Sequence, residues 1–130
     1  MTARQILLVD DEALVRRVLR RGLEKAGYDV TVAENGVAAL EKLDGLEPDV
    51  LITDIEMPKM DGRALCEAVE ARFPERRFPI FVATSLTERE HRVWSSRLNN
   101  LQFLEKPLSM RALLAALAGH FGDPGVAAAD

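Results

Sequence analysis

The sequence has a single cysteine, Cys66, among 130 residues, so it cannot form an internal disulfide. It has no apolar run near the roughly 18 residues that a membrane-spanning helix needs, and its first residues lack the apolar core of a secretory signal. The chain also lacks an excess of positive charge, because it has 17 Lys and Arg but 21 Asp and Glu, for a net charge of −4. Non-specific nucleic-acid binding needs clustered Lys and Arg in excess. We therefore expect a cytoplasmic protein that contacts neither membranes nor nucleic acids directly.

The composition is that of one globular domain. Hydrophobic residues make up 48% of the chain and charged residues 29%, as in ordinary folded proteins. A chain of this length can bury a core of its own. The periodic pattern stops near Gly122, so we expect a domain over residues 1–122 and a short tail over residues 123–130.

Apolar runs typical of strands alternate along the chain with helical patterns. The strands are predicted at Gln5–Val9, Tyr28–Ala33, Asp49–Thr53, Ile80–Thr84 and Leu101–Glu105. Helices are predicted before Gly27, at Gly36–Leu43, at Arg63–Phe73, from Thr87 to about Leu98, and from Met110 to about Phe121. For the fourth of these, Thr87 is the predicted N-terminal cap, and Asn99 is the predicted left-handed residue that ends the helix. One face of the first helix carries Leu14, Val18, Leu19, Leu23 and Ala26. Because each helix returns the chain to the same end of the sheet, the predicted class is α/β, with a doubly wound parallel sheet of five strands.

Polar residues follow the strands at their carboxyl ends, where such sheets bind ligands. Asp10 and Asp11 follow the first strand, Asp54 the third, and Lys106 the fifth, while Thr84 closes the fourth. Two carboxylates about 4 Å apart repel by roughly 4 kcal/mol at an effective dielectric near 20, so an acidic cluster needs protons or a cation. Oxygen ligands alone favour Mg²⁺ or a related ion over zinc or copper.

This set of residues can support phosphoryl transfer to a carboxylate. Asp54 can attack phosphorus, while the metal, the Lys106 ammonium and the Thr84 hydroxyl take up charge on the transferred oxygens. Taken singly, each residue has a structural explanation: acids at a helix N-terminus, a turn-forming Asp, a solvated lysine. Their joint occurrence at the strand ends favours a phosphoryl-transfer site over these separate structural explanations.

Four motifs carry a resemblance to a known family. They are Val9-Asp10-Asp11-Glu12, the segment from Thr53 to Gly62, Ala83-Thr84-Ser85 and Glu105-Lys106-Pro107. In this order they resemble the receiver domain of two-component response regulators, over residues 5–121. The resemblance implies a flavodoxin-like fold with strand order 2-1-3-4-5 and five helices.

The resemblance also implies a role for each acidic residue. Asp54 is the expected phosphorylation site, as a 4-aspartylphosphate. Asp11 and Asp54 are expected to bind Mg²⁺ (or Mn²⁺) directly, helped by the backbone carbonyl of Glu56. Asp10 is expected to act on the metal mainly through bound water.

Further roles fall on residues outside the acidic cluster. Lys106 is expected to pair with the phosphoryl group and to precede a cis bond to Pro107. Thr84 matches the hydroxyl that swings onto a phosphoryl oxygen, and Phe103 the aromatic whose rotamer follows it. Glu56 and Leu86 lie at positions that tune dephosphorylation. Since neither offers an amide to position water, we expect a phospho-form that lasts minutes rather than seconds.

The implied function is a phosphorylation switch that turns over no external substrate. Its phosphodonor would be a histidine kinase or a histidine phosphotransfer protein. The face made by the helix to Leu98, the strand at 101–105 and the last helix would then bind a downstream protein or a second copy. The first helix has a basic face that is either solvated surface or a docking site for an acidic partner. That face consists of Arg16, Arg17, Arg20, Arg21 and Lys25.

Two alternatives remain open. An Mg²⁺-dependent phosphohydrolase of the haloacid dehalogenase type also forms an aspartyl-phosphate, but it needs Asp-x-Asp after the first strand, whereas this chain has Asp54-x-Glu56 after the third. The chain could also be the excised receiver of a transcription factor or hybrid kinase, although no helix-turn-helix pattern follows Phe121. We expect Cys66 to be a buried core residue, and His91 and His120 to be solvated.

Overall fold

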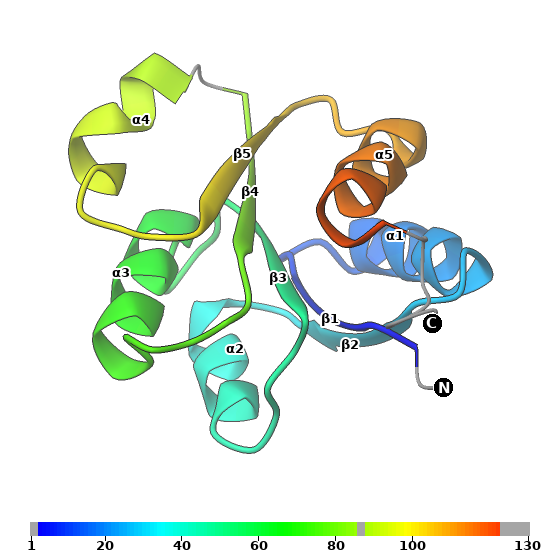
Figure 1. Cartoon of the computed structure of the whole chain (residues 1–130), viewed down its shortest axis with the longest axis horizontal. Coiled ribbons are helices and arrows are strands. Elements are labelled where there is room, and N and C mark those ends of the chain that lie inside the picture. The colour runs from blue at the N-terminus through cyan, green and yellow to red at the C-terminus, as the bar shows by residue number, and fades with distance from the viewer. Residues whose placement is uncertain (1–2, 86–87, 123–130) are drawn as a thin grey trace.

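The computed structural model describes residues 3–85 and 88–122, which form one parallel sheet covered by helices on both faces (Figure 1). The strands are β1 (Gln5–Val9), β2 (Asp29–Ala33), β3 (Val50–Asp54), β4 (Ile80–Thr84) and β5 (Leu101–Glu105). The helices are α1 (Ala13–Lys25), α2 (Gly36–Leu43), α3 (Gly62–Arg72), α4 (Glu88–Ser95) and α5 (Met110–Phe121). The strand order β2-β1-β3-β4-β5 confirms the predicted doubly wound α/β fold.

Two hydrophobic cores lie on the two faces of the sheet. Alternate residues of β1 point to opposite faces, so Leu7 joins one core while Ile6 joins the other. The first core packs against α2, α3 and α4, and the second against α1 and α5 (Figure 1). Every residue of β3 and β4 is buried, as expected for strands covered on both sides.

Helix starts follow the local sequence. The side chains of Asn35, Asp61 and Ser109 accept hydrogen bonds from the third backbone N–H group after them, at 2.8 to 3.0 Å. Each cap satisfies an amide that the helix itself leaves free. Gly27 follows α1 with φ of 105°, a conformation that glycine adopts readily, and the helix ends before it as predicted.

Three local predictions were wrong. The helix α4 ends at Ser95 rather than near Leu98, and the left-handed residue before β5 is Asn100, with φ of 58°, rather than Asn99. On α1, Leu14 and Val18 are 67% and 56% exposed. The predicted Leu19, Leu23 and Ala26 do pack against the core, and Val15, which lines the same side of α1 with Leu19, takes the place expected for Leu14. The proposed Thr87 cap lies outside the described residues.

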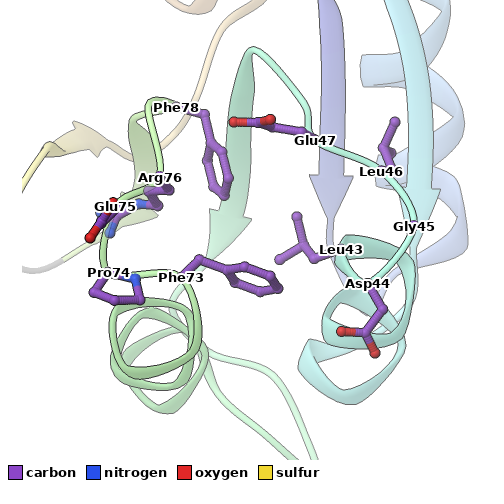
Figure 2. A pocket seen from close by; sticks show the side chains of 10 residues that line it. All are labelled: Leu43, Asp44, Gly45, Leu46, Glu47, Phe73, Pro74, Glu75, Arg76 and Phe78. Atoms are coloured by element: carbon purple, nitrogen blue, oxygen red, sulfur yellow. The ribbon is translucent and has the colours of Figure 1, made fainter.

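Among the described helices, none is long and apolar enough to cross a lipid bilayer. A cleft of about 620 Å³ lies between the segments that precede β3 and β4, at the amino end of the sheet. Leu43, Phe73 and Phe78 line it together with charged residues (Figure 2). It is therefore at the opposite end of the sheet from the predicted acidic cluster.

Candidate functional site

The predicted site residues gather at the carboxyl edge of the sheet. In the strand register Val9 pairs with Thr53, so Asp10 and Asp54 leave neighbouring strands at the same level. Thr84 pairs with Glu105, which places Lys106 directly beyond the end of the next strand. The fold thus assembles at one edge residues that are up to 96 positions apart in the sequence, from Asp10 to Lys106.

Three carboxylates form the centre of the site. One oxygen atom from each of Asp10, Asp11 and Asp54 lies within 4.8 Å of the others. Asp10 and Asp54 are only 8% and 7% exposed, whereas Asp11 is exposed to solvent. Charges of one sign at this separation repel by roughly 3 kcal/mol per pair at an effective dielectric near 20. The cluster therefore attracts a cation.

The surroundings of Asp10 raise its pKa above the usual range. Burial is the main cause, and the negative charges of Asp54 and Asp11 act in the same direction. A hydrogen bond of 2.9 Å from the Glu12 N–H to Asp10 Oδ1 opposes the shift, as does the Lys106 ammonium more weakly. The environment of Asp10 thus disfavours the charged form of its carboxyl group.

Lys106 provides the positive charge nearest to Asp54. Its Nζ lies 2.6 Å from Asp54 Oδ1, and its side chain is 32% exposed. The Lys106-Pro107 bond is cis, as predicted. Beneath the two side chains is a cavity of about 210 Å³, which Asp10, Asp54 and Lys106 line together with apolar residues. The Asp54 carboxylate therefore has a cation on one side and two acids nearby.

The loop after β3 fixes the position of Asp54. Lys59 adopts φ of 67° in the turn, and the Gly62 N–H donates a hydrogen bond of 2.8 Å to the Ile55 carbonyl oxygen. A Cβ on Gly62 would lie 2.7 Å from Ile55 Cα and closer still to the Asp54 carbonyl oxygen. Only glycine lets the start of α3 approach the strand end so closely. Glu56 is exposed, and its carboxylate is not part of the acidic cluster.

Thr84 and Phe103 both contact His91 of α4. Thr84 is buried, and its Oγ1 lies 2.8 Å from His91 Nε2. The His91 ring stacks on Phe103 with 4.8 Å between centroids and 13° between planes.

The prediction that His91 is solvated was wrong, because this residue is only 4% exposed. The sequence around it, Glu-Arg-Glu-His-Arg-Val-Trp-Ser, is largely polar and gives no sign of burial. Its partners Thr84 and Phe103 come from β4 and β5, so a local pattern could not reveal them. A second aromatic three residues on, Trp94, is the one signal within the helix itself.

The predictions for His120 and Cys66 agree with the structure. His120 is exposed, and Cys66 is fully buried among the residues of one core. Burial raises the pKa of the Cys66 thiol to about 12, so it stays protonated and unreactive at neutral pH.

The acidic cluster fits a hard divalent cation. It offers carboxylate oxygens and, within the described residues, contains neither histidine nor cysteine. Such a set suits Mg²⁺ or Mn²⁺, which take oxygen ligands and keep several bound waters. The partly exposed position leaves room for those waters and for a further oxygen ligand.

Known proteins share both the sequence and the fold. The chain is 35% identical, over 112 residues, to the alkaline phosphatase synthesis transcriptional regulatory protein PhoP of Bacillus subtilis, and the match covers 86% of this chain but only 46% of that protein. The chemotaxis response regulator CheY4 of Vibrio cholerae has 31% sequence identity and a TM-score of 0.82, covering 91% of this chain and 98% of that one.

A third relative was solved with ligands. The response regulator TrrA of Thermotoga maritima, in complex with Mg²⁺-BeF, has 27% identity and a TM-score of 0.76, covering 89% of this chain and 97% of that one. Residues 6–118 match the family described as the response regulator receiver domain. With the predicted fold and motifs in place over the same residues, the chain belongs to the receiver domain family of two-component response regulators.

Proposed function

We propose that this chain is a phosphorylation switch in which Asp54 accepts a phosphoryl group from a histidine kinase or a histidine phosphotransfer protein. One observation carries the proposal: a nearly buried Asp54 carboxylate lies beside two further acids and 2.6 Å from the Lys106 ammonium. We assign the receiver to residues 1–122, of which the structure describes 3–85 and 88–122.

The chemistry follows from the charges around Asp54. A carboxylate oxygen of Asp54 attacks the phosphorus, an O–P bond forms, and the P–N bond of the donor phosphohistidine breaks with its electron pair left on the imidazole. Lys106 already pairs with Asp54 Oδ1, so its ammonium is placed to neutralise a transferred phosphoryl oxygen. Since the phosphoryl group stays on Asp54 until water removes it, the protein modifies itself and turns over no substrate of its own.

Asp10, Asp11 and Asp54 would hold Mg²⁺ or Mn²⁺, with the backbone carbonyl of Glu56 as a further ligand. A bound divalent ion supplies positive charge to the phosphoryl oxygens and relieves the repulsion within the acidic cluster. The TrrA relative, solved with Mg²⁺-BeF, supports this assignment. The mutual distances of the three carboxylates support it independently.

We assign Thr84 as the hydroxyl that moves onto a phosphoryl oxygen, and Phe103 as the aromatic that follows it. The contacts of both residues with His91 support a link between them. The expected phospho-form lifetime of minutes depends on Glu56, which is exposed, and on Leu86, which lies outside the described residues. Loss of the phospho-form within a few seconds in Mg²⁺ would contradict it.

Two surfaces are proposed for partners. On α1, Arg17, Arg20, Arg21 and Lys25 are exposed and suit an acidic surface on the phosphodonor, whereas Arg16 is half-buried and donates to the Asp10 carbonyl oxygen at 2.8 Å. Replacing Arg17 and Arg21 by Glu should slow phosphotransfer most at low salt, and equal rates at all salt concentrations would exclude this role. The second surface is the α4-β5-α5 face, which would bind a downstream protein or a second copy.

The alternative of a phosphohydrolase has less support. Its second acid would be Glu56, and that carboxylate lies outside the cluster of Asp10, Asp11 and Asp54. Steady release of phosphate from small phosphomonoesters would revive this alternative.

Labelling with acetyl phosphate tests the proposal. In Mg²⁺, the protein should gain one phosphoryl group by intact mass, and base or hydroxylamine should remove it. Asp54→Asn should gain none, while Asp49→Asn, an acid at the opposite end of β3, should be labelled as the wild type is. Labelling of Asp54→Asn, or of the wild type in excess chelator at an equal rate, would overturn the proposed function.

A further inference from the structure

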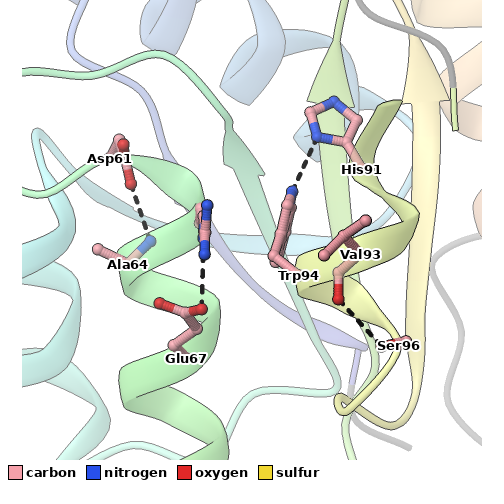
Figure 3. A network of polar contacts seen from close by, with 8 residues as sticks. Asp61, Ala64, Glu67, His91, Val93, Trp94 and Ser96 are labelled. Atoms are coloured by element: carbon pink, nitrogen blue, oxygen red, sulfur yellow. Dashed lines mark hydrogen bonds and ion pairs between the residues drawn. The ribbon is translucent and has the colours of Figure 1, made fainter. Parts of the chain in front are cut away.

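His91 is a buried polar residue that the phosphorylation chemistry does not use. It lies on α4, yet its ring contacts the last residue of β4 and the middle of β5. Its Nε2 lies 2.8 Å from Thr84 Oγ1. Its Nδ1 accepts a hydrogen bond of 3.0 Å from Trp94 Nε1, which Figure 3 shows. Its face stacks on Phe103. One side chain therefore contacts the proposed switch hydroxyl, the proposed switch aromatic and the tryptophan of α4.

These contacts define the tautomer of His91. An indole N–H can only donate, so the Nδ1 that faces Trp94 must carry a lone pair. In the neutral imidazole the proton then resides on Nε2, which faces Thr84. The Nε2–H group thus donates to Thr84 Oγ1 and holds that hydroxyl toward α4.

We propose that His91 is a positioning residue that holds Thr84 in the unphosphorylated state and passes its release to Phe103 and Trp94. The inference rests on the proposed function, in which Thr84 moves toward a phosphoryl group on Asp54. That movement breaks the bond to His91 and leaves a buried donor without its partner, which carries a free-energy cost. His91 therefore opposes the phosphorylated state.

The same contacts provide the route by which the change reaches the surface. When Thr84 leaves, the His91 ring must turn or shift to satisfy its Nε2–H group. Because the ring stacks on Phe103 and accepts from Trp94, neither neighbour can keep its position if His91 moves. Trp94 also packs edge-on against Phe103 at 5.9 Å between centroids, with Arg63 of α3 5.9 Å from its ring. The cluster of these aromatic rings thus joins the switch hydroxyl to the α4-β5-α5 face.

Beryllofluoride with Mg²⁺, a stand-in for the phosphoryl group, tests the proposal through a matched pair of variants. His91→Gln places an amide donor near the position of Nε2, whereas His91→Asn reaches only the position of Nδ1. We expect His91→Asn to bind beryllofluoride about fivefold more tightly than the wild type, as the loss of one hydrogen bond implies. His91→Gln should bind within about twofold of the wild type.

Two further readouts separate this role from a merely structural one. In a Thr84→Ala background, His91→Asn should no longer change beryllofluoride affinity, because the bond is already absent. The chain has two histidines, so ¹⁵N spectra of the imidazoles are simple, and His120→Gln assigns them. We expect His91 to be protonated at Nε2 and not at Nδ1, and its Nε2 resonance to shift when beryllofluoride binds.

Unchanged or weaker beryllofluoride affinity in His91→Asn, an equal effect in the Thr84→Ala background, or an unmoved Nε2 resonance would each overturn the role of His91. Thermal unfolding of every variant checks that the fold is intact, and His91→Phe, which keeps an aromatic face for Phe103, replaces His91→Asn if that variant unfolds. Failure of the wild type to bind beryllofluoride at all would instead count against the proposed function. The two failures are therefore distinguishable.

Discussion

Asp10 is 8% exposed beside two other carboxylates, and burial is the main reason that its pKa is raised. A carboxyl whose pKa is higher in the folded state than in the unfolded state binds its proton more tightly when folded. Its contribution to stability is therefore fully present below the unfolded value of about 3.8 and is lost as pH rises through the raised folded pKa. At neutral pH the charged Asp10 destabilises the metal-free protein.

Asp10→Asn should therefore stabilise the metal-free protein at neutral pH, by on the order of 1 kcal/mol, because a repelled charge is removed. The gain should shrink as pH falls, and the stabilisation that Mg²⁺ gives the wild type should be smaller in the variant. Thermal unfolding across pH, with and without Mg²⁺, measures both effects. Glu41→Gln, which removes an exposed charge on α2, is the control and should show neither.

Gly62 lies against the backbone of the strand end that carries Asp54. Gly62→Ala would push its methyl group into the Asp54 carbonyl oxygen and Ile55 Cα. Since both are backbone atoms, the strand end must shift, and we expect a loss of about 2 kcal/mol in unfolding free energy together with slower labelling by acetyl phosphate. Gly45→Ala is the matched control, because a Cβ at that position would have nothing within 4 Å of it. Equal urea midpoints for the two variants would show that the loop tolerates the methyl group.

At the scale of whole elements, Arg76 ties the end of α3 to the segment before β5. Its Nη1 lies 2.7 Å from Glu70 Oε1 and its Nη2 2.5 Å from the Asn99 carbonyl oxygen, and its side chain is 3% exposed. Arg76→Ala leaves the partly buried Glu70 without its partner, so we expect a loss of about 3 kcal/mol. Arg72→Ala breaks an exposed pair with Asp44 and should cost less than about 1 kcal/mol.

Chemical denaturation of both arginine variants provides the measurement. If the two losses were equal, burial would not be what strengthens the Arg76 contacts. Both variants remove an arginine from an ion pair, and the two pairs differ chiefly in how exposed they are to solvent.

The sequence predicted elements best where local pattern and burial agree. The strands β3 and β4 are buried on both faces, so their apolar runs were unambiguous. The helix α1 was harder, because it carries apolar residues on two adjacent stripes and only packing against the sheet selects one. The exposed Leu14 belongs to the stripe that does not pack against the sheet.

The same contrast applies to the site. Asp10, Asp54 and Lys106 could be placed together from the sequence because parallel strands bring their carboxyl ends to one edge. His91 could not, since its burial depends on Thr84 and Phe103, which reach it from two different strands. Long-range contacts of this kind leave no periodic signal in the helix that carries them.

For the molecule as a whole, the sheet separates the acidic cluster from the cleft that Leu43, Phe73 and Phe78 line. The acids lie at the carboxyl ends of the strands, and the cleft of about 620 Å³ lies at the amino ends, so a ligand in one would not touch the other. By contrast, β5 is an edge strand with α4 and α5 on either side, and Lys106 follows it directly (Figure 1).

The α4 part of the proposed α4-β5-α5 face carries an exposed apolar residue. Val93 on α4 is 87% exposed, next to the His91 and Trp94 cluster. If beryllofluoride and Mg²⁺ favour dimers through this face, burying the valine would contribute about 1.5 kcal/mol. Val93→Glu should then weaken dimerisation about tenfold while changing the free energy of unfolding by less than about 0.5 kcal/mol.

Light scattering over a range of protein concentrations measures the dimerisation. Val18→Glu on α1 is the control, because Val18 is also exposed, at 56%, but lies on the opposite face of the sheet from α4. The control should dimerise as the wild type does. A beryllofluoride form that stays monomeric at every concentration would exclude the dimer, and equal weakening by both variants would attribute it to non-specific apolar contact. Weakening by Val93→Glu alone would assign the dimer contact to the face beside His91.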